Sequence, residues 1–153
     1  PRVKAAMKVV SLLKARAVAT VTGIPALADD TGLEVKALGG APGVHAARFA
    51  GVGATYQDNV TQMLEVMAGV VDRDATFRTV MAVSWPDGRE MVAEGSLDGR
   101  IAASARGRGG FGYDPIFEVG PMTLAEMSLE DKNRISHRAR SLRALIDLLC
   151  QSS

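Results

Sequence analysis

Two adjacent aspartates, Asp29 and Asp30, follow a short apolar run in the segment ALADDTGLEV, residues 26–35. One interpretation is a turn, because aspartate forms turns readily and the following Thr31-Gly32 can complete one. The other is a site for a divalent metal or for phosphate chemistry at the end of a strand, since connecting loops commonly carry function. The choice depends on which other reactive side chains the fold brings to this place.

A glycine-rich segment, RGRGGFGYDPIF at residues 106–117, combines arginines, aromatic rings and a carboxylate. Its glycines can present backbone N–H groups to phosphates, with the arginines as cationic support. It is neither a Walker loop nor a dinucleotide fingerprint, because no Gly-Lys-Ser/Thr follows and it precedes a strand rather than a helix. Phe111, Tyr113 and Asp114 could also form a platform for a flat heterocycle, with rings to stack on and a carboxylate that accepts hydrogen bonds. The alternative is a flexible loop whose aromatic rings cover the core.

The basic segment EDKNRISHRARSLR, residues 130–143, carries Lys132, His137 and Arg138. Its ordinary interpretation is a solvated basic face of a helix. Arg138 can also make bidentate contacts with a phosphate or with the carbonyl-bearing edge of a base, which a lysine cannot imitate. The sequence contains neither Cys/His spacing for zinc nor a Gly-x-Ser-x-Gly serine nucleophile.

Apolar periodicity and turn residues predict the elements that must position these side chains. Helices are expected over residues 5–22, from Thr55 onward and over 128–149, and strands over 25–29, 33–38, 75–85, 90–102 and 115–119. The buried helix stripes are expected to be Val9, Val10, Leu13, Ala17 and Val21, then Tyr56, Val60, Met63, Leu64, Met67 and Val70, and finally Ile135, Leu142, Leu145, Ile146 and Leu149. This order predicts an α/β fold with a mixed central sheet flanked by helices, in a single domain spanning residues 1–153.

Composition narrows the functional classes. With 153 residues, 47% hydrophobic and 23% charged, the chain has the composition of a globular protein, not of a disordered one. A net charge of +1 gives no field for a nucleic-acid polymer, although the basic excess between Arg100 and Arg143 suits a small anionic ligand. The single cysteine, Cys150, cannot form an internal disulfide, and the sequence has no membrane span or signal-peptide pattern. We therefore expect a cytoplasmic protein without a membrane partner.

Three segments, ALADDTGLEVKALGGAPGVHAARFAG, GGFGYDPIF and DKNRISHRARSL, occur together in this order. They resemble the inosine-triphosphate pyrophosphatase family, from about Lys14 to Leu149. The resemblance implies an ITPase-like fold with a β-rich second lobe and a cleft between that lobe and the central sheet. It also implies a Mg²⁺-dependent hydrolase that cleaves purine nucleoside triphosphates with non-standard bases (ITP, dITP, XTP) to the monophosphate and pyrophosphate. Family members commonly form homodimers, with residues 38–49 near the subunit contact.

The resemblance also implies a role for each matched residue. Asp30 would be the catalytic acid/base and a magnesium ligand, with Asp29 as a further metal ligand. Thr31 would contact the substrate, and Lys14 would reach its triphosphate. The residues that would bind and read the purine are Phe111, Gly112, Tyr113, Asp114, Lys132, His137 and Arg138.

The sequence departs from the family pattern at its beginning. Members start with a strand and a Ser/Thr-Gly-Asn-x-x-Lys loop that grips the triphosphate, and no such loop precedes Asp29, so an N-terminal truncation relative to the family is expected. Val9 and Val10 stand where members have an acidic residue and an asparagine, and a valine cannot ligate magnesium. Residues 1–13 are expected either to extend the first helix or to pair across a dimer.

Two functions of different classes therefore remain open. The first is an active nucleoside-triphosphate pyrophosphatase, weakened by these losses. The second is a catalytically impaired descendant that binds purine nucleotides or serves only as a dimeric structural or binding protein.

Overall fold

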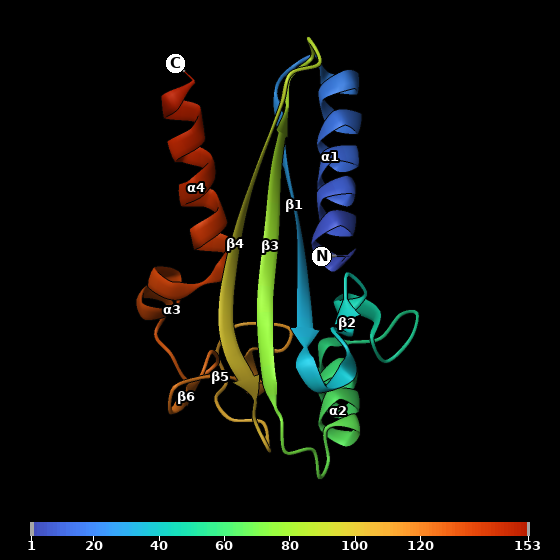
Figure 1. The fold of residues 1–153 in the computed structure, drawn as a ribbon, viewed down its shortest axis with the longest axis vertical. Coiled ribbons are helices and arrows are strands. Elements are labelled where there is room, and N and C mark those ends of the chain that lie inside the picture. Colours follow the sequence, from blue (N-terminus) through green and yellow to red (C-terminus); the bar gives the residue numbers. More distant parts are fainter. Residues whose placement is uncertain (1, 153) are drawn as a thin grey trace.

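The computed structural model describes residues 2–152, which form four α-helices and a six-stranded sheet. Long strands lie at the centre and short ones at both edges (Figure 1). The helices are α1 (Arg2–Thr22), α2 (Tyr56–Val66), α3 (Leu129–Ile135) and α4 (His137–Gln151). The strands are β1 (Ala26–Val35), β2 (Pro42–Gly43), β3 (Asp74–Ser84), β4 (Glu90–Ile101), β5 (Phe117–Val119) and β6 (Met122–Thr123).

The sheet has the order β2-β1-β3-β4-β5-β6, and its pairings are all antiparallel within residues 2–152. The α/β class is confirmed, but the sheet is not mixed. A tight hairpin joins β3 to β4, in which the Gly88 N–H donates to the Trp85 carbonyl at 3.0 Å and so forces an antiparallel return. Pro86-Asp87-Gly88 thus forms the turn between the strands that were predicted at residues 75–85 and 90–102.

Strand β1 is one long strand where two short ones were predicted. Asp30, Thr31 and Gly32 stay in register with Val80, Thr79 and Arg78 of β3, so the chain does not turn here. The turn interpretation of the paired aspartates is wrong, and they lie in the middle of a strand rather than at its end. Propensity misleads at this point because pairing with β3 continues through residues that favour turns in isolation.

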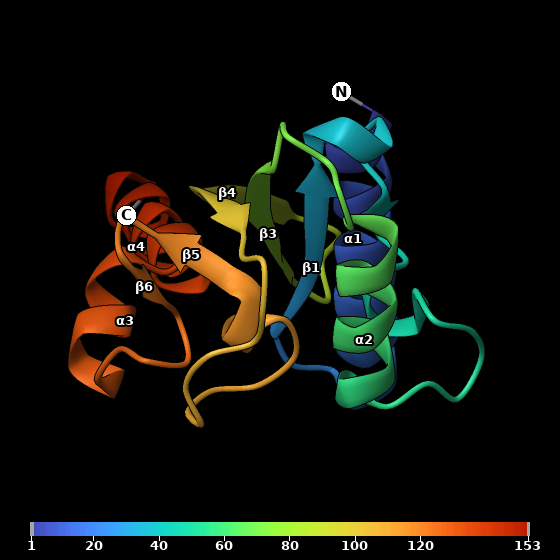
Figure 2. The ribbon, with the colours of Figure 1, turned by 90° about the horizontal axis from the view of Figure 1, so that it is seen from below.

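Helices α1 and α4 cover opposite faces of the sheet (Figures 1 and 2). Glu94 pairs in register with Val80 and binds Lys4 of α1, which places α1 on that face. The neighbouring Gly95 faces the other way, and a Cβ at this position would overlap with the His137 carbonyl of α4. Side chains that alternate along the central strands therefore meet α1 and α4 in turn.

The buried face of α1 differs from the predicted one. Met7, Ser11, Ala15 and Ala19 are buried, whereas most of the predicted valine and leucine stripe is exposed, with Val21 at 87%. Small residues at this four-residue spacing let the helix approach the sheet closely, and the Ser11 hydroxyl donates to the Val80 carbonyl at 2.8 Å. Of the two alternatives for residues 1–13, the described part extends the first helix.

Helix α2 begins where the sequence predicted. Thr55 and Asp58 form the reciprocal capping box, and Val60 and Met63 are buried. Tyr56, predicted to be core, is instead 61% exposed. As the first residue of the helix, it precedes the turn that packs on the core.

The predicted last helix is two helices, α3 and α4, which meet at Ser136. Ser136 has an extended backbone (φ −61°, ψ 147°), and its side chain accepts a hydrogen bond from the Ala139 N–H to start α4. Ser128, where the predicted helix begins, caps α3. Leu145 is buried from the predicted stripe, whereas Leu142 and Ile146 are exposed. None of the helices within residues 2–152 is long and apolar enough to cross a membrane.

Replacement of Gly95 by alanine is expected to destabilise the fold. The new Cβ would overlap with backbone atoms of His137 and Ser141, so α4 has to move away from the sheet. Overpacking of this kind costs about 2 kcal/mol or more of unfolding free energy, measurable by urea denaturation. Glu94→Ala is the control, because its exposed ion pair with Lys4 on the other face contributes less than about 1 kcal/mol. Equal stability of the two variants would show that the packing of α4 on the sheet does not depend on the absence of a side chain at position 95.

Candidate functional site

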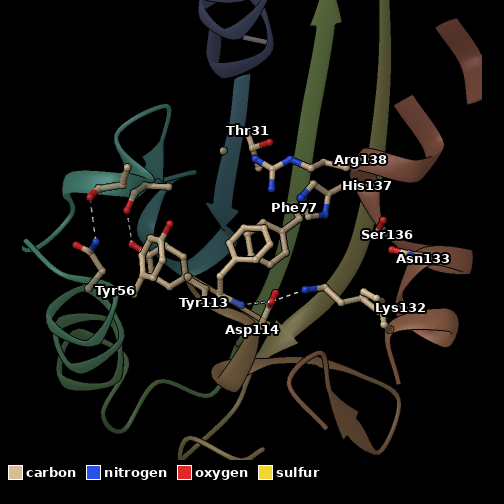
Figure 3. Close-up of a pocket in the computed structure, with 17 residues that line it drawn as sticks. Thr31, Tyr56, Phe77, Tyr113, Asp114, Lys132, Asn133, Ser136, His137 and Arg138 are labelled. Atoms are coloured by element: carbon tan, nitrogen blue, oxygen red, sulfur yellow. Dashed lines mark hydrogen bonds and ion pairs between the residues drawn. The ribbon is translucent and has the colours of Figure 1, made fainter. Parts of the chain in front are cut away.

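A pocket of about 300 Å³ opens beside the long strands, near the junction of α3 and α4 (Figure 3). Figure 3 draws Tyr56 and Tyr113 on its α2 side and Lys132, His137 and Arg138 on its α3–α4 side. The pocket is predominantly apolar with a few polar groups, as is typical of small-molecule sites. Its lining consists of Thr31, Gly32, Ala46, Ala47, Tyr56, Asn59, Phe77, Phe111, Gly112, Tyr113, Asp114, Leu129, Lys132, Asn133, Ser136, His137 and Arg138.

A buried ion pair between Asp114 and Lys132 forms the floor of the pocket. The same Asp114 carboxylate oxygen accepts a hydrogen bond from the Phe111 N–H at 2.8 Å. Gly110 adopts a positive φ of 74°, and a Cβ there would overlap with the Asp114 carboxylate. The glycine-rich segment is therefore bent around a carboxylate that fixes the backbone of Phe111.

The ring of Phe111 lies beside two cations. The Lys132 Nζ atom is 4.9 Å and the Arg138 Cζ atom 5.2 Å from its centroid, and the ring itself is 52% exposed. Cations at these distances are attracted to the ring quadrupole. The pocket thus offers a flat aromatic surface next to donors that suit carbonyl and phosphate oxygens.

His137 is buried and lies against Phe77, with ring centroids 4.7 Å apart and an interplanar angle of 18°. Its Nδ1 atom has no hydrogen-bond partner among residues 2–152. Burial, together with the nearby Arg138 and Lys132 charges, lowers the pKa of His137 to about 4, while Asp29 opposes them. The imidazole is therefore neutral at pH 7 and can exchange a hydrogen bond with a ligand.

The break at Ser136 aims the start of α4 at the pocket. Without it, His137 and Arg138 would lie within a continuous helix, where their backbone N–H groups would be used. Because α4 starts here, its positive end also favours a negatively charged ligand atom nearby.

Asp29, Asp30 and Thr31 diverge because they are successive residues of one strand. The Asp29 Oδ2 atom accepts from the Arg138 Nε atom at 3.1 Å, and the Thr31 and Thr79 hydroxyls are 2.7 Å apart, both on the α4 face. Asp30 points to the α1 face, where its Oδ1 atom is 3.3 Å from the Lys14 Nζ atom. The two aspartates predicted to share a metal are thus separated by the sheet, and Asp30 does not line the pocket.

The Asp30 carboxylate has one oxygen in use and one free. Its Oδ2 atom is buried and has no hydrogen-bond partner within the described chain. The Lys14 Nζ atom, which contacts the other oxygen of this carboxylate, also donates to the Asp29 carbonyl at 3.1 Å. An unpaired buried carboxylate oxygen beside a lysine is a fitting ligand for a cation that accompanies a phosphate chain.

The model of the Ham1 family matches residues 3–148. The chain belongs to the Ham1 family. Curated relatives of the chain include the dITP/XTP pyrophosphatase of Desulfotalea psychrophila, 50% identical over 131 residues, and that of Symbiobacterium thermophilum, 51% identical over 142 residues. They cover 84% and 91% of this chain, which spans 59% and 71% of their own lengths.

Solved Ham1 structures have the same fold as this chain. The Staphylococcus aureus Ham1 protein superposes with a TM-score of 0.88 at 39% identity, covering 94% of this chain and 76% of that protein. The Coxiella burnetii HAM1 protein gives 0.86 at 41% identity, covering 92% and 75%. Membership of the Ham1 family confirms the resemblance on which the fold and the site residues were predicted.

Several lining residues of this Ham1 chain were not singled out from its sequence. Phe77 lies in an alternating strand and carries no motif signal, whereas Asn133 lies within the segment DKNRISHRARSL but was given no role of its own. Asn59 holds the adjoining loop, accepting from the Ala50 N–H at 2.8 Å and donating to the Ala47 carbonyl at 3.0 Å. The one sequence signal that could have singled out Asn59 is that a polar residue stands within the apolar stripe of the predicted helix.

The pKa of His137 gives a prediction on stability. Because the folded pKa is about 4 and the ordinary value is 6.5, the unfolded chain binds more protons between these limits. The stability contribution is therefore complete above pH 6.5 and is lost as the pH falls toward 4, by about 3 kcal/mol.

An NMR titration of the His137 ring is expected to give a midpoint near 4. In urea denaturation between pH 7 and pH 4.5, His137→Gln is expected to lose less stability than the parent chain. A ring midpoint near 6.5 would contradict the burial argument.

Proposed function

We propose that this Ham1 chain hydrolyses purine nucleoside triphosphates with non-standard bases, such as ITP, dITP and XTP, to the monophosphate and pyrophosphate. The observation that carries the proposal is the pocket that combines an exposed aromatic ring, Phe111, with a neutral buried His137 and a cationic Arg138. The names of the curated relatives, dITP/XTP pyrophosphatase, support the same substrate class. A further support is a Mycobacterium abscessus nucleoside-triphosphatase / dITP/XTP pyrophosphatase with a TM-score of 0.79 and 39% identity, covering 94% of this chain and 75% of that protein.

The base end of the pocket is built for a 6-oxo purine. Arg138 and Lys132 can only donate hydrogen bonds, and a 6-oxo group accepts them whereas the amino group of adenine does not. Asp114 accepts hydrogen bonds and suits the N–H groups of the same ring. A site whose buried donors need an acceptor rejects ligands that lack one.

The phosphate end lies along β1, where Lys14 and Asp30 meet. We propose that Lys14 binds the phosphate chain and that Asp30 orients the attacking water and takes up its proton. Mg²⁺ is the proposed cofactor, and when bound it neutralises phosphate charge and polarises the phosphorus. Asp30 would hold it through the free Oδ2 atom, the remaining ligands being water and phosphate oxygens, as is usual for this ion. Asp29 is better suited to positioning Arg138 than to binding the metal.

A second function is supported by the sparse ligand set. Among residues 2–152, no group of three or more His, Cys, Asp or Glu side chains could hold a metal ion. Val9, at the position of the family acid, is exposed and offers no oxygen. Nucleotide binding with slow or no turnover, as a catalytically impaired descendant, is therefore the alternative.

We also propose that the chain is a single domain and a cytoplasmic homodimer. The compartment is supported by the lone Cys150, which is free and exposed. The dimer is supported by the family resemblance of residues 38–49. A Tyr113 hydroxyl bond to the Ala46 carbonyl at 2.7 Å ties that segment to the pocket.

Two isosteric substitutions separate the roles of the paired aspartates. Asp30→Asn is expected to lower pyrophosphate release from ITP at least a hundredfold with the fold retained, because the amide neither binds the cation well nor accepts a proton. Asp29→Asn is expected to lower it less, because it weakens only the hold on Arg138. The measurement is pyrophosphate release with and without Mg²⁺.

The outcomes distinguish the two functions. A parent chain that binds inosine nucleotides but releases no pyrophosphate would support the alternative. Full activity of folded Asp30→Asn would remove Asp30 from the mechanism.

Light scattering tests the dimer, which is expected to give about twice the 16.1 kDa chain mass. Because the family resemblance implies that residues 38–49 lie near the subunit contact, a charge introduced there by Val44→Glu is expected to shift the mass toward the monomer. A monomeric mass for the parent chain at high concentration would contradict the proposal.

A further inference from the structure

Tyr56 is an aromatic residue of the pocket to which no role has been given so far. It opens α2 at the mouth of the pocket, 61% exposed, and its hydroxyl makes no hydrogen bond within residues 2–152. Its ring instead faces Phe111, with centroids 6.4 Å apart and an interplanar angle of 43°. Two half-exposed rings beside each other at the mouth of the pocket offer stacking surface to a flat ligand.

We infer that Tyr56 and Phe111 form an aromatic clamp that holds the planar base of the nucleotide between them. This inference rests on the proposed function. Carbon atoms in contact lie about 3.5–4.0 Å apart, so a flat ring between two others needs walls separated by roughly 7–8 Å. The present 6.4 Å is slightly less than this, and a small rotation of either exposed side chain would open the gap and align the rings.

The backbones on both sides of the clamp are fixed by hydrogen bonds, whereas both residues are more than half exposed. On one side, the Thr55–Asp58 capping box sets the first turn of α2, and Asn59 bonds that turn to the neighbouring loop. On the other, Asp114 holds the Phe111 N–H. The ordering of two rings between fixed anchors loses few degrees of freedom, which favours binding.

The clamp divides recognition between stacking and hydrogen bonding. Every base has a flat face, so Tyr56 and Phe111 would strengthen binding of any purine about equally. The choice among purines then stays with the donors at the edge of the ring, Lys132, His137 and Arg138. Tyr56 accordingly raises the binding affinity for all purine bases and discriminates little among them.

Calorimetric titration with inosine 5′-monophosphate tests the clamp. Tyr56→Ala is expected to weaken binding about tenfold, the usual contribution of one stacked ring. Tyr56→Phe, which keeps the ring and loses the hydroxyl, is expected to bind within twofold of the parent chain. Tyr56→Leu, which keeps apolar bulk without a ring, is expected to behave like Tyr56→Ala. Gln57→Ala is the matched control on the same exposed turn, outside the pocket lining, and is expected to change nothing.

Each outcome decides a separate claim. Equal affinity of Tyr56→Ala and the parent chain, with unchanged thermal unfolding, overturns the clamp and leaves the proposed function standing. Weak binding by Tyr56→Phe overturns stacking in favour of the hydroxyl. Absence of inosine-nucleotide binding by the parent chain overturns the proposed function and the clamp together.

Discussion

Successive side chains of a strand point to opposite sides, and in β1 this alternation organises the whole candidate site. Asp29 meets Arg138 of α4 and Thr31 lines the pocket, while Asp30 between them meets Lys14 of α1. A purine bound in the pocket and a phosphate chain bound at Lys14 would therefore contact opposite faces of the same strand, β1. A nucleotide can bridge them only by passing over the β1 edge, which pairs with β2 no further than Leu33 and Glu34.

The burial of His137 illustrates how the fold sets chemistry at the pocket. Its ring is covered by Phe77 from the sheet, and its backbone carbonyl lies close to Gly95, whose missing side chain admits α4. Two residues on adjacent strands thus contribute to the burial that lowers the pKa of a third residue on a helix. The same packing leaves Arg138, one residue further along, partly exposed and able to reach both Asp29 and Phe111.

Local sequence signals predicted the fold where local physics decides it. The start of α2, set by the Thr55–Asp58 cap, and the two strands joined by the hairpin at Gly88 depend on neighbouring residues, and both lie where they were predicted. The buried face of α1 could not be predicted, because a helix that lies tightly on a sheet buries small residues, and apolar periodicity favours large ones. The break at Ser136 was hidden because the apolar pattern continues through it.

The site was predictable to the extent that it consists of motifs. Asp114, Lys132, His137 and Arg138 lie together as the family resemblance implied. Phe77 and Tyr56 were not found, because their positions are set by strand register and by the exposed start of a helix. Neither is visible as a spacing in the sequence.

The exposed apolar side chains of α1 and of the connection between α1 and β1 affect the thermodynamics of unfolding. Val21 and Ile24, among others, are already hydrated in the native chain, so unfolding exposes little new surface there. The heat-capacity increment and the denaturant m-value both scale with newly exposed surface. The heat-capacity increment and the m-value are therefore smaller than in a chain of equal length whose corresponding apolar side chains are buried. The curve of stability against temperature is correspondingly flatter.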